Sequence, residues 1–399
     1  MTANAATEAD TPARRLRDAP YLAVIFLDSL SYALVLPLLP FILAEHGAGA
    51  SAGGLLVAAH AIMAACSAPI LGIVSDRIGR RPVILGTLAG AVLAYGLFAI
   101  SPNLILLFMS RALAGAMAGN IGVVQAAIAE GHAPSDRTRA MGRMTATWAL
   151  GFVVGPAVSA ALPVAERSIA LWPGVLAGVV TLLAMLVVAA DRQRVVSVAT
   201  AKADQGAVPG MPVLDRGTLI GLFGTLAIAQ TGLVAMTGFW ASRIFGWGPR
   251  EVSLLFLASA AAIVLFQLAV LPRLSERFSE TRLLKGFLVL GVGCCAAVVA
   301  GPGTAAILAV AGSLLFCAIT GAQTVCTACL SRATSSRAQG AVLGGANGVA
   351  AICRVAAPIL CGTLFELVRP EAPYYLVAVL FLVWLGLLGL RAARPMRSA

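Results

Sequence analysis

The stretch Gly72-Ile73-Val74-Ser75-Asp76-Arg77-Ile78-Gly79-Arg80-Arg81 decides the fold class of this chain. Apolar residues precede it and resume at Pro82, so it predicts a turn between two helices. A charged turn is costly inside lipid, which places it at a membrane surface, and its arginines make that surface cytoplasmic. We expect Gly72 and Gly79 to allow close packing and a sharp reversal, and Asp76 to lie near the start of the second helix. An ordinary basic loop would need the arginines but not this ordered pattern.

The composition is that of a polytopic membrane protein. The 399 residues are 60% hydrophobic and 11% charged, whereas soluble proteins carry about 25% charged residues. The net charge of +11 resides in short basic clusters between apolar runs, without interleaved aromatic residues, so no nucleic-acid partner is expected. The eight cysteines lie in apolar segments and form a single C-x-x-C pair, Cys326 and Cys329, so neither a metal site nor a cofactor is expected.

Twelve apolar runs have the length of membrane-spanning helices, about 20 residues. We expect an all-α protein of two six-helix bundles, residues 1–190 and 216–399, joined by a polar cytoplasmic linker, 191–215. The predicted spans are 20–44, 52–75, 82–101, 103–130, 139–162, 169–190, 216–241, 251–272, 283–301, 303–330, 338–366 and 373–391.

The basic residues orient these spans. If both termini are cytoplasmic, most of the Lys and Arg residues fall in cytoplasmic connections. The exceptions are Arg167, Arg243, Arg250 and Arg369 on the outer side, and Arg111 and Arg354 within spans. We therefore expect a multi-pass protein of the inner membrane with both termini in the cytoplasm.

The two halves repeat each other. Ser75-Asp76-Arg77 returns as Ser275-Glu276-Arg277, and Gly155-Pro156 of span 5 returns as Ala357-Pro358 of span 11. Internal repeats with a substrate site between them are typical of secondary transporters. The second copy lacks the glycines and arginines of the first, so we expect unequal turns.

Asp28 and Arg111 lie inside spans of the first half, where charged residues are costly and usually functional. Asp28 in span 1 is a candidate to bind a proton; the alternative is a structural pair with Arg111 or a polar helix neighbour. We expect Arg111 of span 4 to face the bundle interior, the alternative being a side chain that snorkels to the outer surface. Gly115 and Gly119 follow Arg111 and predict a close helix contact.

Further polar residues within spans are candidates to bind a substrate. His60 either exchanges a proton or is a packed, hydrogen-bonded helix residue. Arg354 either is solvated by water and Gln230, Gln267 or Gln323, or faces a central cavity. The full set of substrate-binding candidates is Asp28, His60, Asn120, Gln125, Gln230, Gln323, Asn347 and Arg354.

Several motifs together resemble the major facilitator superfamily, in particular the tetracycline-efflux branch of its 12-span drug:H+ antiporters. They are the turn at residues 72–81, Arg111 to Gly119 in span 4, Gly151-Phe152-Val153-Val154-Gly155-Pro156 in span 5, and Phe26 to Pro40 in span 1. The resemblance implies a gate latch, proton coupling and an antiporter signature. The residues of the gate latch would be Gly72, Asp76, Arg77, Gly79, Arg80 and Arg81. Proton coupling would depend on Asp28 and Arg111. The antiporter signature would consist of Gly151, Gly155 and Pro156.

The chain departs from that branch in two spans. Tetracycline exporters carry an acid in span 3, where this chain has Ala94, and another in span 9, where it has none. This argues against tetracycline itself as the substrate, since a metal chelate needs carboxylates.

The sequence thus predicts a monomeric transporter rather than an enzyme. No Walker-type phosphate loop or Ser/His/Asp constellation is present, so ATP-driven transport by this chain alone is not expected. The first hypothesis is a proton-coupled exporter of small amphipathic compounds, whose partners are the substrate, protons and the bilayer. The second is a transporter of an anionic or zwitterionic metabolite, such as a siderophore or an amino-acid derivative, because Arg354 has no visible acid partner. The third is a membrane receptor or scaffold that does not transport.

Overall fold

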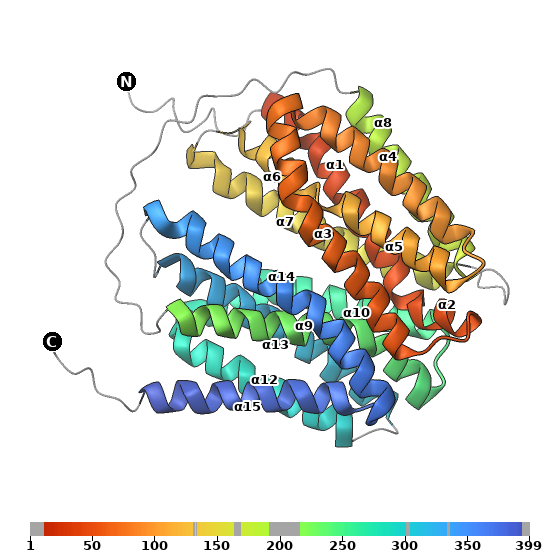
Figure 1. Ribbon diagram of the computed structural model, residues 1–399. Helices are drawn as coiled ribbons and strands as arrows, with labels where there is room; N and C mark the ends of the chain where they lie inside the picture. The colour runs from red at the N-terminus through yellow and green to blue at the C-terminus, as the bar shows by residue number, and fades with distance from the viewer. Residues whose placement is uncertain are drawn as a thin grey trace, which may run out of the picture. The chain divides into compact units, whose positions relative to one another are not determined.

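The structure is a computed structural model that describes residues 12–130, 132, 134–162, 169–190, 216–300, 304–332 and 336–392. The regular elements within those ranges are helices, which Figure 1 shows in chain order. The predicted all-α class is therefore confirmed. The predicted linker 191–215 lies outside the described residues.

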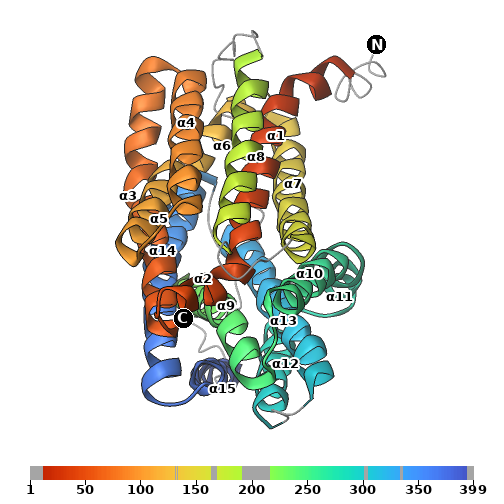
Figure 2. The same cartoon turned by 90° about the vertical axis from the view of Figure 1, so that its right-hand side faces the viewer.

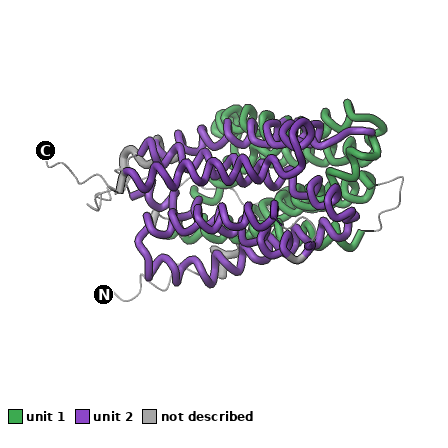
Figure 3. Tube along the Cα trace, turned by 90° about the horizontal axis from the view of Figure 1, so that it is seen from below, with its two compact units in different colours: residues 1–46, 59–203 green, residues 47–58, 204–399 purple. Residues whose placement is uncertain are grey.

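The chain forms two compact units, coloured separately in Figure 3. Unit 1 comprises residues 1–46 and 59–203, and unit 2 comprises residues 47–58 and 204–399. One helix, α3, contributes its first turns to unit 2 and the remainder to unit 1. The domain limits predicted from the sequence stay a prediction.

Unit 1 is a bundle in which α1 packs against α7 and α8, and α4 packs against α5 and α8 (Figure 2). A core of apolar side chains from α1, α4, α6, α7 and α8 joins these helices, including Val24, Ile84 and Val124. Its elements are α1 (Pro12–Val35), η2 (Leu36–Leu38), α2 (Leu39–Glu45), α3 (Ala50–Ile78), α4 (Arg80–Ala99), α5 (Leu104–Ala118), α6 (Ile121–Glu130), α7 (Pro134–Ala161) and α8 (Leu171–Ala190).

Unit 2 repeats this plan, with α9 packed against α14 and α12 packed against α13 and α15. Trp240 of α9 is fully buried and packs edge-on against Tyr374 of α15, at 5.6 Å between ring centroids. The elements of this unit are α9 (Arg216–Phe245), α10 (Pro249–Leu265), η3 (Phe266–Val270), α11 (Leu271–Arg277), α12 (Glu280–Ala300), α13 (Ala305–Arg332), α14 (Ser336–Leu367) and α15 (Ala372–Ala392).

Among the described residues, twelve helical stretches are long and apolar enough to cross a membrane, which confirms the twelve predicted spans. Three of these stretches are interrupted. The first passes from α1 through η2 to α2, where Pro37 and Pro40 lack the backbone N–H that a continuous α-helix needs. The fourth is divided between α5 and α6 at Gly119 and Asn120, and the eighth contains the π-helical segment η3.

Glycines bring specific helices into close contact, as the sequence predicts. A Cβ atom at Gly155 of α7 would lie 2.9 Å from the carbonyl oxygen of Leu30 in α1, and one at Gly119 would lie 2.8 Å from the backbone nitrogen of Ala68 in α3. Only glycine permits such an approach. Gly72 does not behave in this way: a Cβ there would meet nothing within 4 Å, so the expected close packing is wrong.

The turn that opened the sequence analysis is shorter than predicted. Helix α3 continues to Ile78 and α4 begins at Arg80, so the reversal is made by Gly79 alone, at a φ of +95° that favours glycine. Asp76 consequently lies in the last turn of α3 and not at the start of α4. An acid is unfavourable at this end of a helix dipole, but the adjacent Arg80 compensates its charge.

Candidate functional site

Arg80 is the centre of an ion-pair network at one end of unit 1. Its guanidinium lies 2.6 Å from Asp76 Oδ1 and 2.7 Å from Glu130 Oε1, and it also donates to the Ser75 hydroxyl. These contacts connect α4 to α3 and to the end of α6. We call Arg80 with its three partners the unit 1 latch. Glu130 was not anticipated, because it is far from the motif in the sequence.

The other residues of the motif divide into two groups. Arg81 donates to the carbonyl oxygens of Val188, at 3.2 Å, and Ala189, at 2.7 Å, and so caps the end of α8. A cation at this end also interacts favourably with the helix dipole. Arg77 is exposed and does not take part in the unit 1 latch.

A second ionic cluster in unit 1 was missed by the sequence analysis. Asp18 of α1 is buried, and its Oδ2 lies 2.9 Å from an Arg143 nitrogen and 3.2 Å from His132 Nε2. His132 Nδ1 lies 2.8 Å from the carbonyl oxygen of Ile128, at the end of α6. The cluster fastens the start of α1 to α6 and α7. Only the fold brings together residues so distant in the sequence.

Unit 2 holds a counterpart of the Arg80–Glu130 pair with the charges exchanged. Arg332 Nη1 lies 2.8 Å from Glu280 Oε1, and Cys329 donates to the other oxygen of this carboxylate at 3.1 Å. Glu280 opens α12 as Arg80 opens α4, and Arg332 ends α13 as Glu130 ends α6. We call Glu280 and Arg332 the unit 2 latch. The repeated sequence Ser275-Glu276-Arg277 does not contribute to it.

Asp28 lies in the part of α1 that packs against α7. A Cβ at Gly151 of α7 would lie 2.7 Å from the carbonyl oxygen of Phe26, so the antiporter-like sequence holds this part of α1 in place. The Asp28 side chain is partly exposed, and the described residues include no ion pair between it and Arg111. The alternative of a structural Asp28–Arg111 pair is therefore not seen.

Arg111 of α5 is buried, with 1% of its surface exposed, and so does not snorkel to a membrane surface. Its Nε, Nη1 and Nη2 atoms have no hydrogen-bond partner among the described residues. Its Cζ atom lies over two rings, 5.6 Å from the centroid of Tyr32 and 5.9 Å from that of Phe98. Such cation–π contacts compensate a buried charge only in part.

His60 of α3 adjoins the same place. Its ring packs at 5.0 Å from the Tyr32 ring, and it is hydrogen-bonded to the backbone of Arg111. Its Nδ1 atom is buried and has no hydrogen-bond partner in the part of the chain that the structure describes. The structure thus brings His60 and Arg111 of the predicted site together around Tyr32, which lies one helical turn after Asp28.

The remaining candidates of unit 1 are less central. Asn120 is buried, and its side-chain amide donates to the Thr87 hydroxyl at 3.1 Å. This bond fastens the interruption between α5 and α6 to α4. Gln125 is exposed on α6.

The candidates of unit 2 are dispersed over three helices. Gln230 of α9, Gln323 of α13 and Arg354 of α14 are partly exposed, and Asn347 of α14 is exposed. Arg354 has no ion pair with an acid of the described residues.

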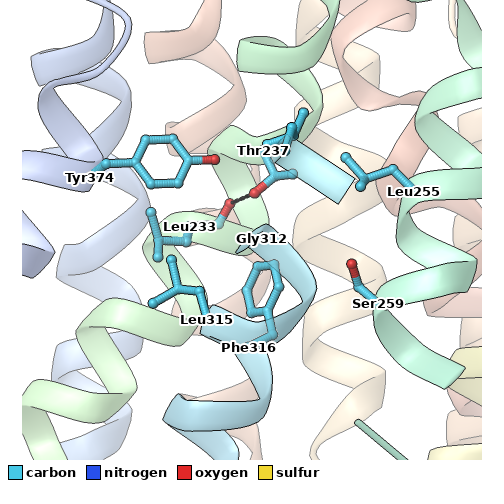
Figure 4. Close-up of a pocket in the computed structure, with 9 residues that line it drawn as sticks. Leu233, Thr237, Leu255, Ser259, Gly312, Leu315, Phe316 and Tyr374 are labelled. Atoms are coloured by element: carbon cyan, nitrogen blue, oxygen red, sulfur yellow. Dashed lines mark hydrogen bonds between the residues drawn. The ribbon is translucent and has the colours of Figure 1, made fainter. Parts of the chain in front are cut away.

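Figure 4 shows a small enclosed cavity in unit 2, lined by residues of α9, α10, α13 and α15. Its volume is about 10 Å³, which corresponds to one water molecule rather than to a substrate. The Thr237 hydroxyl already donates to the carbonyl oxygen of Leu233, at 2.7 Å, and Ser259 pairs with Ser313 at 3.0 Å. We therefore do not place the substrate there.

The family model of the Major Facilitator Superfamily matches residues 21–352. The chain belongs to this superfamily. Among its relatives, the class D tetracycline resistance protein of Salmonella ordonez is 30% identical over 277 residues, covering 67% of this chain and 69% of that protein. The class G protein of Vibrio anguillarum is 28% identical over 85% of this chain and 87% of its own length.

Solved structures of superfamily transporters share the fold. The human organic anion transporter MFSD10 (TETRAN) superimposes with a TM-score of 0.69 at 22% identity, over 95% of this chain and all of that chain. A bacterial homologue of the human lysosomal transporter Spinster superimposes with a TM-score of 0.77 at 13% identity, over 96% of this chain and 97% of that chain. The protein is accordingly a multi-pass transporter of a small-molecule substrate, and not a member of an enzyme family.

Proposed function

We propose that the chain is a proton-coupled antiporter that exports small amphipathic compounds by alternating access. The observation that carries this proposal is Asp28. It is a carboxylate within a membrane span, partly exposed, and the described residues show no ion pair between it and the buried Arg111. A group that takes up a proton in one step and releases it in another needs both access and freedom from a permanent ion pair.

Two further features support export. The sequence from Gly151 to Pro156 packs directly against the segment of α1 that carries Asp28, and resembles the signature of antiporters. The relatives named as tetracycline resistance proteins are related over most of their length. Because Ala94 stands where those exporters carry an acid, the proposed substrates are amphipathic compounds other than a tetracycline–metal chelate.

The proposed setting follows from the distribution of basic residues. The protein would lie in the inner membrane as a monomer with both termini in the cytoplasm, so that the unit 1 latch is at the cytoplasmic surface. The proposed domains are residues 1–190 and 216–399, joined by the linker 191–215.

The test uses inside-out membrane vesicles that contain the full chain, with an imposed proton gradient reported by a fluorescent dye. A coupled substrate should dissipate the gradient when it is added, whereas vesicles without the protein should not respond. Tetracycline, a lipophilic cation and an amphipathic acid form a suitable first set. If the vesicles transport a substrate and the proton gradient does not change, this result would contradict proton coupling.

A second candidate function is transport of an anionic or zwitterionic metabolite. Arg354 favours it, because a guanidinium in the middle of a span is retained only with compensation, and no described acid of unit 2 forms an ion pair with it. The structural neighbour named as an organic anion transporter is consistent with such a substrate. Arg354→Gln should then reduce uptake of an anionic compound but not of a cationic one, and equal effects on both would remove this candidate.

A further inference from the structure

We propose that Arg111 anchors the anionic group of a flat aromatic acid, and that Tyr32, Phe152 and Trp148 form the surface on which the aromatic part of that ligand stacks. This inference rests on the proposed function, because it assigns a ligand class to the unit that carries Asp28. All of the residues involved belong to unit 1.

The guanidinium of Arg111 provides the first argument. A buried charge without a counter-ion costs several kcal/mol, so it is retained where something compensates it. In the structure, three guanidinium nitrogens lack partners and two aromatic rings lie nearby. A cation–π contact contributes about 0.5–2 kcal/mol, less than a fork of charge-assisted hydrogen bonds to a carboxylate. A carboxylate that displaces the Tyr32 ring would therefore be a better partner.

His60 provides the second argument. Its unpartnered Nδ1 atom is buried beside the same ring that covers Arg111. Close contact between α3 and α5 at Gly115, where a Cβ would lie 2.8 Å from the Cα atom of His60, fixes the two residues next to each other. In a neutral imidazole whose other nitrogen donates to the Arg111 backbone, Nδ1 is an acceptor. His60 can therefore accept from a donor group of the ligand, while the anionic group itself pairs with Arg111.

The third argument is a row of aromatic rings that runs from this point to the surface of unit 1. Tyr32 lies 6.0 Å from Phe152, and Phe152 lies 4.3 Å from Trp148, between ring centroids. Trp148 is 40% exposed, so the row of rings reaches the surface of unit 1. A row of ring faces that ends at a cation suits a ligand with a planar aromatic body and one negative group.

The test measures binding by purified full-length protein in lipid nanodiscs, without a proton gradient. The probe is 4-nitrobenzoate, which quenches tryptophan fluorescence; 4-nitrobenzyl alcohol has the same ring without the charge. We expect saturable quenching by the anion, at an affinity at least roughly tenfold higher than that of the alcohol, a difference of about 1.4 kcal/mol. Equal affinities for the two probes in the unmodified protein would overturn the inference, and this comparison needs no folded variant.

Three variants locate the site. Arg111→Gln should weaken 4-nitrobenzoate binding at least roughly tenfold, while the control variant Arg250→Gln, at an exposed arginine of α10, should leave it unchanged. Trp148→Phe should remove most of the quenching, with binding still detectable by equilibrium dialysis. Unchanged binding in Arg111→Gln would overturn the assignment to Arg111. Because no gradient is present, failure of this inference is distinguishable from failure of coupled transport.

Discussion

The two latches occupy equivalent places in the repeat but differ in strength. In unit 1 the paired side chains, Arg80 and Glu130, are 18% and 32% exposed, and Arg80 is also held by Asp76 and Ser75. In unit 2 the pair Glu280–Arg332 is 37% and 73% exposed, and only Cys329 adds to it. A partly buried network resists solvent and salt, whereas an exposed pair contributes little. Both units therefore have an ion pair at the equivalent position. The charges are exchanged between the two units, and the pair in unit 2 contributes less to stability.

The same inequality extends into the membrane spans. Unit 1 groups His60 and Arg111 around Tyr32, one helical turn from Asp28, whereas the polar candidates of unit 2 are dispersed and Arg354 has no ion pair among the described residues. This difference suggests that unit 1 holds the coupling chemistry and the stronger gate, while unit 2 contributes mainly shape. The following predictions can break or sharpen that division of roles.

The largest effect is expected from charge reversal at the latches. Arg80→Glu would place a third carboxylate between Asp76 and Glu130, and we expect a loss of about 2–4 kcal/mol in stability. Arg332→Glu, the matched variant of unit 2, faces Glu280 alone in water and should cost less than about 1 kcal/mol. Melting temperatures of the purified proteins in detergent measure the difference.

Exchanging both charges sharpens this comparison. The double variant Glu280→Arg with Arg332→Glu should recover the stability of the unmodified protein, since it rebuilds the same pair in reverse. The double variant Arg80→Glu with Glu130→Arg should recover only part of it, because Asp76 would still face a carboxylate at position 80. Equal recovery in both units would show that the latches are equivalent after all.

Neutralising the same arginines should have a smaller effect. Arg80→Gln removes charge-assisted hydrogen bonds to two helices and should cost about 1–2 kcal/mol. Arg332→Gln should cost between about 0 and 1 kcal/mol. Raising the salt concentration should lower the melting temperature of the unmodified protein little, because the stronger latch is partly buried. A larger loss for Arg332→Gln than for Arg80→Gln would contradict the proposed order.

The smallest effect on stability is expected for Asp76→Asn. The Asp76 side chain is 63% exposed, so its pair with Arg80 contributes less than about 1 kcal/mol. We nevertheless expect slower turnover. Asp76, at the end of α3, helps to hold Arg80 of α4 in the unit 1 latch, and the family resemblance implies that this latch is a gate. Transport rates in proteoliposomes, corrected for the amount of folded protein, test this; unchanged rates would exclude a gate role for Asp76.

The sequence alone predicts the spans and the close helix contacts well, but not the partners of the charged groups. Apolar length reports the twelve spans directly, and the glycines at 115, 119, 151 and 155 report close contacts through their missing Cβ atoms. The partner of Arg80 is 50 residues away, and that of Asp18 more than 100 residues away. Such pairs depend on how helices pack, and no local pattern records them. Gly72 shows the opposite error: it belongs to a recognisable motif, but it makes no close helix contact.

The central claim is that Asp28 carries the coupled proton, and Asp28→Asn tests it most directly. The measurement compares, in proteoliposomes, substrate accumulation driven by a proton gradient with exchange of labelled for unlabelled substrate in its absence. The variant should fold and exchange substrate, but it should neither accumulate substrate nor move protons, because an amide does not take up a proton near neutral pH. Accumulation by Asp28→Asn at the rate and pH dependence of the unmodified protein would contradict the claim and make Asp28 a structural residue.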